Sequence, residues 1–213
     1  LNMVYAGGSF GRRANPQSDY LLETAQIVKA INGRAPVKLV WTREDDMRGG
    51  FYRPLYLHRV RAALDSAGMP VAWQQRIVGQ SIIAGSPFEG FLIKDGIDVT
   101  SVEGAATLPY AVPNLHVDLH TTNAQVKVPV QWWRSVGSTH TAFSTEVFLD
   151  ELAGAAGKDP VAYRLALLEK HPRHAGVLKL AAEKAGWDKP LAASKSGKRG
   201  RGVAVHESFN TFV

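Results

Sequence analysis

A glycine-rich turn near the start of the chain constrains its fold more than any other feature. The turn has the sequence Gly7-Gly8-Ser9-Phe10-Gly11-Arg12-Arg13. It follows an apolar run, residues 1–6, that predicts a short strand, and it precedes a helical pattern that opens at Ser18. Glycines at a strand-to-helix turn let the backbone adopt positive φ angles, and free amide groups there can face an anion.

The turn matches neither common nucleotide-binding signature. It lacks the third glycine spacing of G-x-G-x-x-G and the Gly-Lys-Ser/Thr end of a Walker A loop. Two interpretations therefore stay open. The guanidinium groups of Arg12 and Arg13 either bind a phosphate-bearing cofactor of another kind, or they form the solvated basic end of a tight turn.

Helix and strand patterns continue after the turn. Residues 18–32 place apolar side chains at helical spacing, with Ser18 as the expected N-cap and Gly33 as the stop. Residues 37–41 are apolar and predict a buried strand. Residues 42–50 carry three adjacent acids that are not spaced to converge on one metal ion, so we interpret them as a solvated turn or helix end.

A long β-hairpin is the clearest element in the middle of the chain. Residues 56–64 and 71–80 alternate in the manner of strands, and Ser66-Ala67-Gly68 supplies the turn between them. Residues 81–106 are rich in glycine, serine and other small residues, and predict a long loop or lid. Residues 115–121 predict another strand.

That later strand carries its polar side chains on one face. His116, Asp118 and His120 alternate with apolar residues, so the three side chains point to the same side. Two histidines and a carboxylate are suitable metal ligands. A simply exposed face produces the same pattern, and we prefer that interpretation.

A second motif has the sequence Gln131-Trp132-Trp133-Arg134-Ser135-Val136-Gly137-Ser138-Thr139-His140. The pattern after it predicts a helix to about residue 155. The side chains expected to be buried at helical spacing are Phe143, Val147, Phe148 and Leu152. Glu146 and Asp150 lie one turn apart, and we expect them on an acidic outer face rather than as a functional carboxylate pair.

Two further helices and a strand are expected before the end of the chain. Asp159-Pro160 is a cap followed by proline at the first helical position, and predicts a helix through residue 168. Residues 174–185 predict the next helix, and His171 and His174 are placed in the loop before it. Residues 202–209 begin a last strand.

Composition excludes several classes of function. The chain has 213 residues, a formal net charge of +6 and no cysteine, so it contains no disulfide and no thiolate ligand for a metal or an iron–sulfur cluster. Part of the positive charge lies in residues 195–201, where no aromatic residue is interleaved for base stacking, so a solvated loop is preferred over a nucleic-acid site. No apolar run is long enough to span a bilayer.

The two motifs together resemble a known family. The glycine turn, the Trp133-Arg134-Ser135-Val136-Gly137 segment and the helix that follows, with Phe148-Leu149-Asp150-Glu151-Leu152, are similar to the molybdopterin-binding large subunit of the xanthine dehydrogenase/aldehyde oxidase family. Within that family the chain most resembles the bacterial isoquinoline 1-oxidoreductase β subunit and related aldehyde oxidoreductases. The resemblance covers nearly the whole chain.

The resemblance implies roles for residues in both motifs. It places Phe10 and the backbone of Gly11 beside the molybdenum centre, with Phe10 and Val136 lining the substrate pocket and no residue of this chain ligating the metal directly. The positions implied for binding molybdopterin, commonly its cytosine dinucleotide form in bacteria, are Gly8, Ser9, Phe10, Gly11, Arg12, Arg134, Ser135, Gly137 and Ser138.

Three departures from the family pattern concern the substrate. One is that the arginine which purine-oxidising relatives use on the purine ring has no match in residues 90–107. Purine-oxidising relatives have a glutamate where this chain has Ala14 and a phenylalanine where it has Val136. Without such anchors the polar groups of a purine would lack hydrogen-bond partners, so a neutral N-heterocyclic aromatic compound or an aldehyde is the expected substrate.

The resemblance also implies that this chain is an internal fragment of a longer subunit. The family's glutamate general base is expected beyond Val213, so the fragment alone is predicted to be inactive. Electrons are expected to pass to a small [2Fe–2S] subunit, and the rest of the large subunit is a second expected partner. The alternatives are a non-catalytic anion- or nucleotide-binding domain that uses Arg12 and Arg13, and a nucleic-acid module that uses residues 195–201.

The expected fold class is α+β. Strands are mixed with helices and include a long β-hairpin, which favours a mixed sheet covered by helices on one side, with the hairpin as an insertion. By resemblance, residues 1–139 hold part of a molybdenum-cofactor-binding domain. Residues 140–213 are expected to form a helical connection and the first strand of the next domain.

Overall fold

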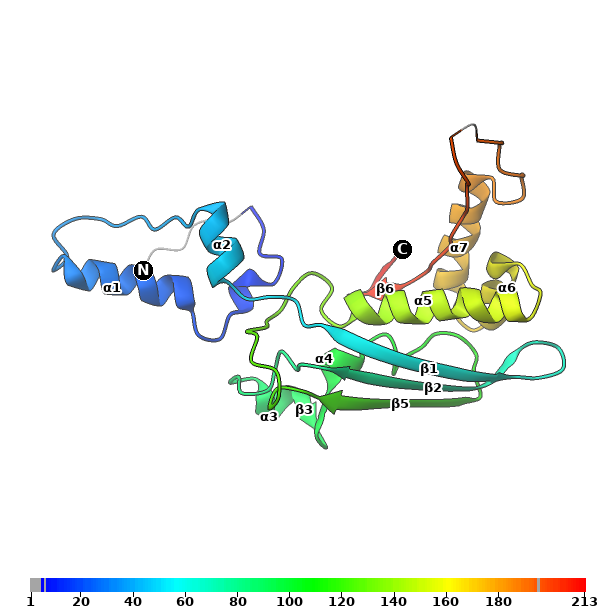
Figure 1. Ribbon diagram of the computed structural model, residues 1–213, viewed down its shortest axis with the longest axis horizontal. Coiled ribbons are helices and arrows are strands. Elements are labelled where there is room, and N and C mark those ends of the chain that lie inside the picture. Colours follow the sequence, from blue (N-terminus) through cyan, green and yellow to red (C-terminus); the bar gives the residue numbers. More distant parts are fainter. Residues whose placement is uncertain (1–4, 6, 195) are drawn as a thin grey trace. The chain divides into compact units, whose positions relative to one another are not determined.

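The computed structural model describes residues 5, 7–194 and 196–213, and its chain forms two compact units (Figure 1). The first unit comprises Leu1–Leu55, Gly79–Val99 and Thr121–Val136, and the second comprises Tyr56–Val78, Thr100–His120 and Gly137–Val213. The predicted first strand lies outside the described residues except for Tyr5. The predicted domain boundary at residue 139 stays a prediction.

A three-stranded sheet is the framework of the second unit. Its strands are β1 (Tyr56–Leu64), β2 (Pro70–Gly79) and β5 (Asn114–Thr121), in the order β1-β2-β5. The predicted hairpin and the predicted third strand are both confirmed. Gly68 adopts a φ of 74° in the turn, where the carboxylate of Asp65 accepts hydrogen bonds from the backbone of Ala67 and Met69.

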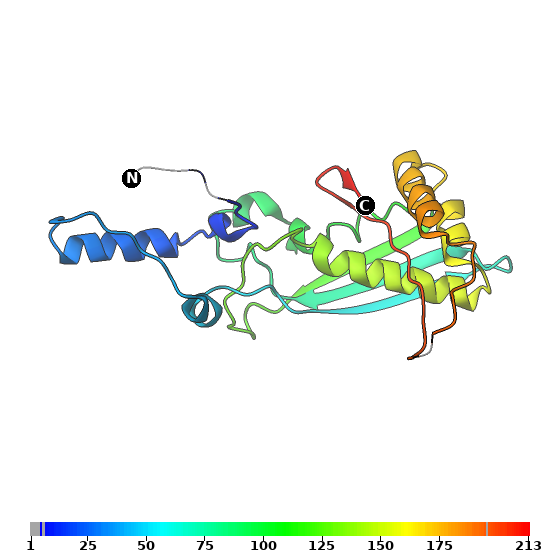
Figure 2. The ribbon, with the colours of Figure 1, turned by 90° about the horizontal axis from the view of Figure 1, so that it is seen from above.

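The sheet is mixed, as expected. Strands β1 and β2 are joined by the tight turn, so they run antiparallel. Strand β5 runs parallel to β2, because Asn114 Nδ2 donates to the carbonyl of Val71 near both starts (2.9 Å) and Thr122 N donates to the carbonyl of Gly79 at both ends (2.9 Å). The α+β prediction is confirmed, with helices on one face of the sheet (Figures 1 and 2).

Helix α5 (Ser138–Ala155) packs along that face (Figure 2). Burial alternates strictly along β1, which is the pattern of a strand with one covered and one open face. The rings of Phe148 on α5 and Trp73 on β2 form a T-shaped pair at a centroid distance of 4.9 Å. The buried core around this contact comprises Trp73, Tyr110, Leu149, Leu152, Ala153, Val161, Tyr163, Leu167, Leu168, Leu178 and Val205.

The buried face of α5 differs from the predicted one. Leu152 is buried, but the Phe143 side chain is 72% exposed and Val147 is 42% exposed, so the prediction that both are buried is wrong. Polar residues such as Thr141 and Thr145 take the covered positions and bond to backbone carbonyls of the preceding turn. Apolar periodicity alone therefore selected the wrong face.

Two helices and a short hairpin complete the second unit. They are α6 (Pro160–Leu167), α7 (Pro172–Ala185), β6 (Glu207–Ser208) and β7 (Thr211–Phe212). Both helices were predicted, and Gly186 ends α7 in a left-handed conformation. The strand expected over residues 202–209 is confined to β6, which pairs antiparallel with β7. No helix among the described residues is both long and apolar enough to cross a bilayer.

Replacing Asp159 by alanine is expected to destabilise α6 by about 1–2 kcal/mol. Asp159 Oδ1 accepts hydrogen bonds from the backbone N–H groups of Val161 and Ala162 at 3.0 and 2.8 Å, and Oδ2 accepts from Trp187 Nε1 at 2.8 Å. Faster amide exchange in α6, measured by mass spectrometry, would report the loss. Asp159→Asn, which keeps an N-cap acceptor, should lose less; equal exchange in the alanine variant and wild type would contradict the assigned cap.

Short elements make up the first unit. Besides the 3₁₀ turn η1 (Arg12–Ala14), they are α1 (Asp19–Ala30), α2 (Arg43–Gly49), α3 (Glu89–Leu92), β3 (Ile93–Lys94) and β4 (Ile97–Asp98); α4 (Val99–Val102) begins at the junction with the second unit. The acidic segment predicted as a turn or helix end is α2, which a capping box between Thr42 and Asp45 begins.

Two predictions for the first unit are wrong. Residues 37–41 form no strand, because no described segment pairs with them and an apolar run becomes a strand only with a hydrogen-bonding partner. Ser18 precedes α1 with a φ of 51° and makes no side-chain capping bond. The predicted helix is confirmed as α1, but none of its apolar side chains is fully buried among the described residues, and Leu22 is 55% exposed.

Candidate functional site

The glycine turn of the first unit is tight and uses positive φ angles. Gly8, Phe10 and Gly11 have φ values of 152°, 52° and 98°. The carbonyl of Ser9 accepts from the N–H of Arg12 at 3.0 Å, and Ser9 Oγ accepts from the N–H of Arg13 at 3.2 Å. The turn therefore leads directly into η1.

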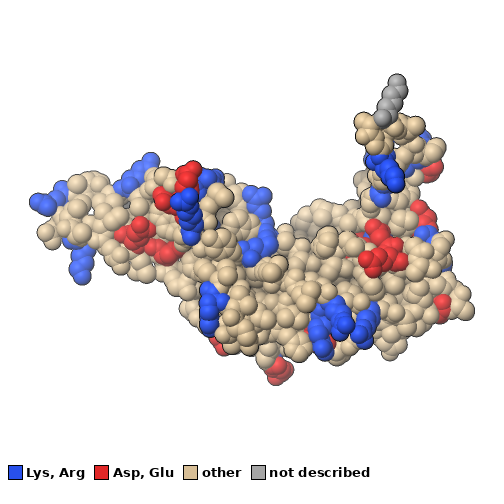
Figure 3. Space-filling model, in the orientation of Figure 1, with Lys and Arg blue, Asp and Glu red and all other residues tan. Residues whose placement is uncertain are grey.

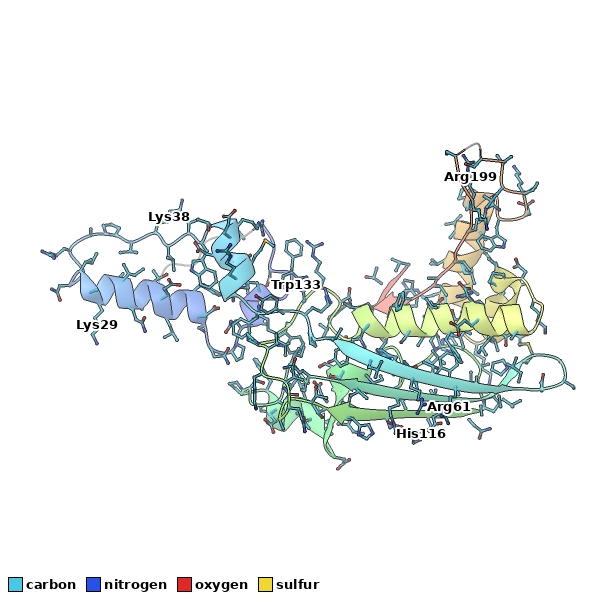
Figure 4. The ribbon with its side chains drawn as sticks, viewed as in Figure 1. Lys29, Lys38, Arg61, His116, Trp133 and Arg199 are labelled. Carbon is cyan, nitrogen blue, oxygen red and sulfur yellow. The ribbon has the colours of Figure 1, made fainter. Side chains whose placement is uncertain are left out.

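The second motif contains an equally unusual backbone. Ser135 and Val136 have φ values of 60° and 47°, and the N–H of Val136 donates to the carbonyl of Trp133 at 2.8 Å. A left-handed conformation is costly for a β-branched residue, by about 1–3 kcal/mol, and such strain is concentrated at functional sites. Trp133 itself is 41% exposed (Figure 4).

The two motifs meet within the first unit although they are far apart in sequence. The guanidinium carbon of Arg134 lies 4.4 Å from the centroid of the Phe10 ring, in cation–π geometry. A Cβ added at Gly11 would lie 2.5 Å from the carbonyl oxygen of Trp132. Only glycine permits this close approach of the two backbone segments.

The junction of the motifs is electropositive. Arg53 donates from Nη1 to the carbonyl of Arg134 at 3.2 Å. Burial, together with the positive charge of Arg134, lowers the pKa of Arg53. Two guanidinium groups close together favour an anionic group beside them.

Arg12 already has a carboxylate partner. Its Nη1 and Nη2 atoms donate to Asp19 Oδ1 and Oδ2 at 2.9 and 2.8 Å, and its guanidinium carbon lies 5.2 Å from the ring centroid of Tyr20. Arg13 is exposed, with its guanidinium 6.0 Å from the same ring. Of the two arginines considered for phosphate binding, Arg12 is thus held by the protein's own acid.

Gly137 and Ser138 belong to the second unit, where they begin α5. Their backbone N–H groups donate to Glu103 Oε1 at 2.7 and 3.2 Å. A Cβ on Gly137 would collide with the carbonyl oxygen of Thr100. The first amides of α5 therefore bind a carboxylate of the same chain, which is the kind of group that a helix N-terminus favours.

Ser138 also lines a pocket of about 420 Å³ in the second unit. Its titratable lining residues are Glu103, His171, His174, His206 and Glu207. No group of three or more histidine and acidic side chains among the described residues is arranged to hold a metal ion. The pocket is therefore a polar cavity without the geometry of a metal centre.

His174 in this pocket corrects a prediction. It was expected to be exposed, but it is buried in the first turn of α7, and its ring and that of Phe212 form a T-shaped pair at a centroid distance of 4.8 Å. Burial lowers the pKa of His174, although the carboxylate of Glu207 at 3.6 Å opposes the change. The hairpin that covers it was not recognisable from local sequence.

Asn15 and Gln131 were not identified from the sequence as site residues. Both are buried in the first unit, and the Nδ2 atom of Asn15 and both side-chain amide atoms of Gln131 have no hydrogen-bond partner among the described residues. Buried amide groups of this kind normally bind protein, water or ligand. Gln131 directly precedes the two tryptophans of the second motif, which is the one sequence feature that points to it.

Glu146 also contradicts its prediction. Instead of lying on an acidic outer face, it is buried in the second unit and accepts from Tyr110 Oη at 2.8 Å, Arg164 Nε at 2.9 Å and the N–H of Val205 at 3.0 Å. Asp150 binds the same guanidinium at 2.6 Å and is 40% exposed. Burial raises the pKa of Glu146, opposed by the charge of Arg164. Each member has its partners, as expected of a structural network.

The polar face of β5 is confirmed as a shared, largely exposed face. His116 and His120 place Nε2 atoms 3.5 and 3.4 Å from the carboxylate of Asp118. Arg76 on β2 donates to the same carboxylate at 2.7 Å, and this hydrogen bond lowers the pKa of Asp118. The carboxylate of Asp118 is therefore already paired with a cationic side chain.

Comparison with known proteins identifies the family. Residues 1–167 match the molybdopterin cofactor-binding domain, so the chain belongs to that family. This confirms the resemblance noted from the two motifs.

Individual relatives agree with this assignment. Isoquinoline 1-oxidoreductase subunit beta of Brevundimonas diminuta is 31% identical over 214 residues, which cover 100% of this chain and 26% of the relative. A membrane-bound aldehyde dehydrogenase of Gluconacetobacter polyoxogenes, named for pyrroloquinoline quinone, is 35% identical over 188 residues, which cover 83% of this chain and 23% of the relative. The chain thus spans about a quarter of the length of these relatives.

A solved structure supports the fold. Quinoline 2-oxidoreductase from Pseudomonas putida 86 superposes with a TM-score of 0.64 at 20% identity, over 86% of this chain and 24% of that chain. At this identity the similarity concerns the fold alone.

Proposed function

We propose that this chain forms part of the molybdenum-cofactor site in the large subunit of a molybdenum hydroxylase. The observation that carries the proposal is the meeting of the two motifs, with Arg134 over the ring of Phe10 and Gly11 against the backbone of Trp132. Membership of the molybdopterin cofactor-binding domain family supports it. The proposed cofactor-binding residues are those implied by the resemblance, from Gly8 to Arg12 and from Arg134 to Ser138 except Val136.

The residues around this junction fit a pterin cofactor. A pterin carries hydrogen-bond donors and acceptors on a flat ring, and the unpartnered amide atoms of Asn15 and Gln131 offer both. The charges of Arg53 and Arg134 suit its phosphate. Because the guanidinium of Arg12 binds Asp19, Arg12 is proposed to contribute by holding the backbone of the glycine turn in place, not by direct contact of its side chain with the cofactor. When bound, the cofactor supplies the two-electron redox chemistry.

The proposed substrate is an aldehyde or a neutral N-heterocyclic aromatic compound, with Phe10 and Val136 lining its pocket. The exposed ring of Phe10 provides an apolar surface, and Val136 adds no hydrogen-bonding group. Relatives are named for isoquinoline and for aldehydes, and both substrate classes fit such a pocket. The strained backbone of residues 135–136 is proposed to hold this wall in place.

Partners of the whole enzyme belong to the same proposal. The chain has no cysteine, so a [2Fe–2S] acceptor would be ligated by a partner or by another domain. The general base is proposed to lie outside these residues, and this chain alone is expected to be inactive. The cytosine dinucleotide form of the cofactor is proposed on the resemblance alone.

The alternative function, a non-catalytic anion-binding domain, has less support once the contacts of Arg12 are known. It relied on Arg12 and Arg13, and Arg12 is paired with Asp19. The amides that begin α5 are likewise paired, with Glu103. The cofactor proposal needs neither group to be free.

Phe10→Ala in the full-length enzyme is expected to lower turnover per bound molybdenum about tenfold to hundredfold while leaving the fold intact. The Phe10 ring packs against the guanidinium of Arg134 and forms a wall of the proposed pocket. Small errors in substrate placement lower the reaction rate by up to about a hundredfold. Steady-state rates with an artificial acceptor, normalised to molybdenum, measure the effect.

Phe143→Ala is the matched control, because Phe143 is exposed on α5 in the second unit. It should turn over at the wild-type rate. Wild-type turnover in the Phe10 variant, or an equal loss of turnover in both variants, would show that the glycine turn has no specific role in the reaction.

A further inference from the structure

The open face of the β1-β2-β5 sheet is basic. Its outward side chains include Arg59 and Arg61 on β1, Arg76 on β2 and His116 on β5, all exposed. Figure 3 shows a blue cluster over the sheet, and Figure 4 shows that Arg61 and His116 lie near each other on it. Within the second unit, the described helices pack on the opposite face (Figures 1 and 2). We call these residues, together with Gln74, the basic sheet face.

Arg59 and Arg61 have no acidic partner among the described residues, in contrast to Arg76, which binds Asp118. They are two positions apart on one strand, so their side chains leave the same face about 7 Å apart. Two like charges at this spacing repel each other and add nothing to the fold. Their placement is therefore suited to binding rather than to folding.

Two adjacent hollows lie on this face. Arg59, Arg61, Gln74 and Arg76 line one of about 230 Å³. The other, of about 600 Å³, shares Arg61 and Gln74 and is otherwise lined mainly by apolar or small residues, among them Ala63, Ala72, Pro113 and Leu115. A cationic hollow thus continues into an apolar one along the strands.

We propose that the basic sheet face is a docking surface for an acidic protein segment that also carries apolar side chains. Carboxylates would bind Arg59 and Arg61, and neighbouring apolar groups would occupy the larger hollow. The proposal is independent of the cofactor site.

Other occupants fit less well. The outward side chains of these strands include no phenylalanine, tyrosine or tryptophan on which a base could stack, which disfavours nucleic acid. A second copy of this chain, with its net charge of +6, would bring like charge to the face.

The test measures binding of a fluorescein-labelled peptide of alternating glutamate and leucine to the full-length protein by fluorescence anisotropy. We expect saturable binding that weakens as salt is added. The double variant Arg59→Glu/Arg61→Glu should bind about a hundredfold more weakly, at about tenfold for each arginine. Lys170→Glu/Lys179→Glu, which makes the same change of charge at exposed positions of the same unit, should bind as wild type does.

Three results would overturn the proposal. The first is no binding of the acidic peptide by the wild-type protein. The second is an equal loss of binding affinity in both double variants, which would show that binding depends only on the net charge of the protein. The third is tighter binding of an oligothymidine strand of equal charge, lost in the Arg59/Arg61 variant, which would assign the face to nucleic acid.

Discussion

Replacing Gly11 by valine is expected to reduce the molybdenum content of the full-length protein at least about tenfold. The new Cβ would lie 2.5 Å from the carbonyl oxygen of Trp132 and 2.9 Å from the backbone nitrogen of Trp133, and a β-branched residue is strained at a φ of 98°. Relief requires the two motifs to separate. Each cost of about 1.4 kcal/mol weakens cofactor binding tenfold. Metal analysis by mass spectrometry measures the loss.

Gly33→Val is the matched control for this experiment. Gly33 also has a positive φ, 65°, but a Cβ there meets nothing within 4 Å. The control therefore carries backbone strain without the collision, and should keep its molybdenum. Full metal content in the Gly11 variant would show that close packing of the two motifs is not required for binding the cofactor.

Arg164→Met is expected to lower the free energy of unfolding of the second unit by about 3–5 kcal/mol. Arg164 is fully buried and donates to Glu146 Oε2, to the backbone carbonyl of Glu146 and to Asp150. Methionine has a similar shape but leaves the carboxylate of Glu146 buried without its cation. Amide exchange in α5 and α6, analysed as local unfolding free energies, measures the effect.

Arg59→Met makes the same chemical change at an exposed position of the sheet, and should alter stability by less than about 0.5 kcal/mol. Asp150→Asn is expected to cost little, because Asp150 is partly exposed and Arg164 keeps its bonds to Glu146. If the Arg164 variant exchanged no faster than the Arg59 variant, the buried network would not be a principal source of stability.

Elements set by local chemistry were predictable from the sequence. The hairpin followed from strict alternation and from Gly68 in its turn, and the start of α6 followed from Asp159-Pro160. The two motifs were recognisable because glycine and arginine occur there in an uncommon order. In each case the residues that determine the structure lie within a few positions of one another.

Features set by distant partners were not predictable. The burial of Glu146 depends on Tyr110, Arg164 and Val205, which approach from three other segments. Residues 37–41 have the composition of a strand but no partner strand in the described residues.

In the candidate site, too, some features are determined by neighbouring residues and others by residues far apart in the sequence. Apart from the tryptophans that follow Gln131, nothing in the local sequence marks Asn15 or Gln131 as a site residue. Only the structure shows that their amide groups are buried without hydrogen-bond partners among the described residues. The pairing of Arg12 with Asp19 is local, but charge pattern alone could not separate it from an anion site.

The most direct test of the central claim is the molybdenum and pterin content of the full-length protein as purified. If Gly11 and Arg134 belong to one cofactor site, molybdenum should be present in near-stoichiometric amount, and denaturation should release a pterin. A protein without molybdenum, or one that releases pyrroloquinoline quinone instead, would contradict the account.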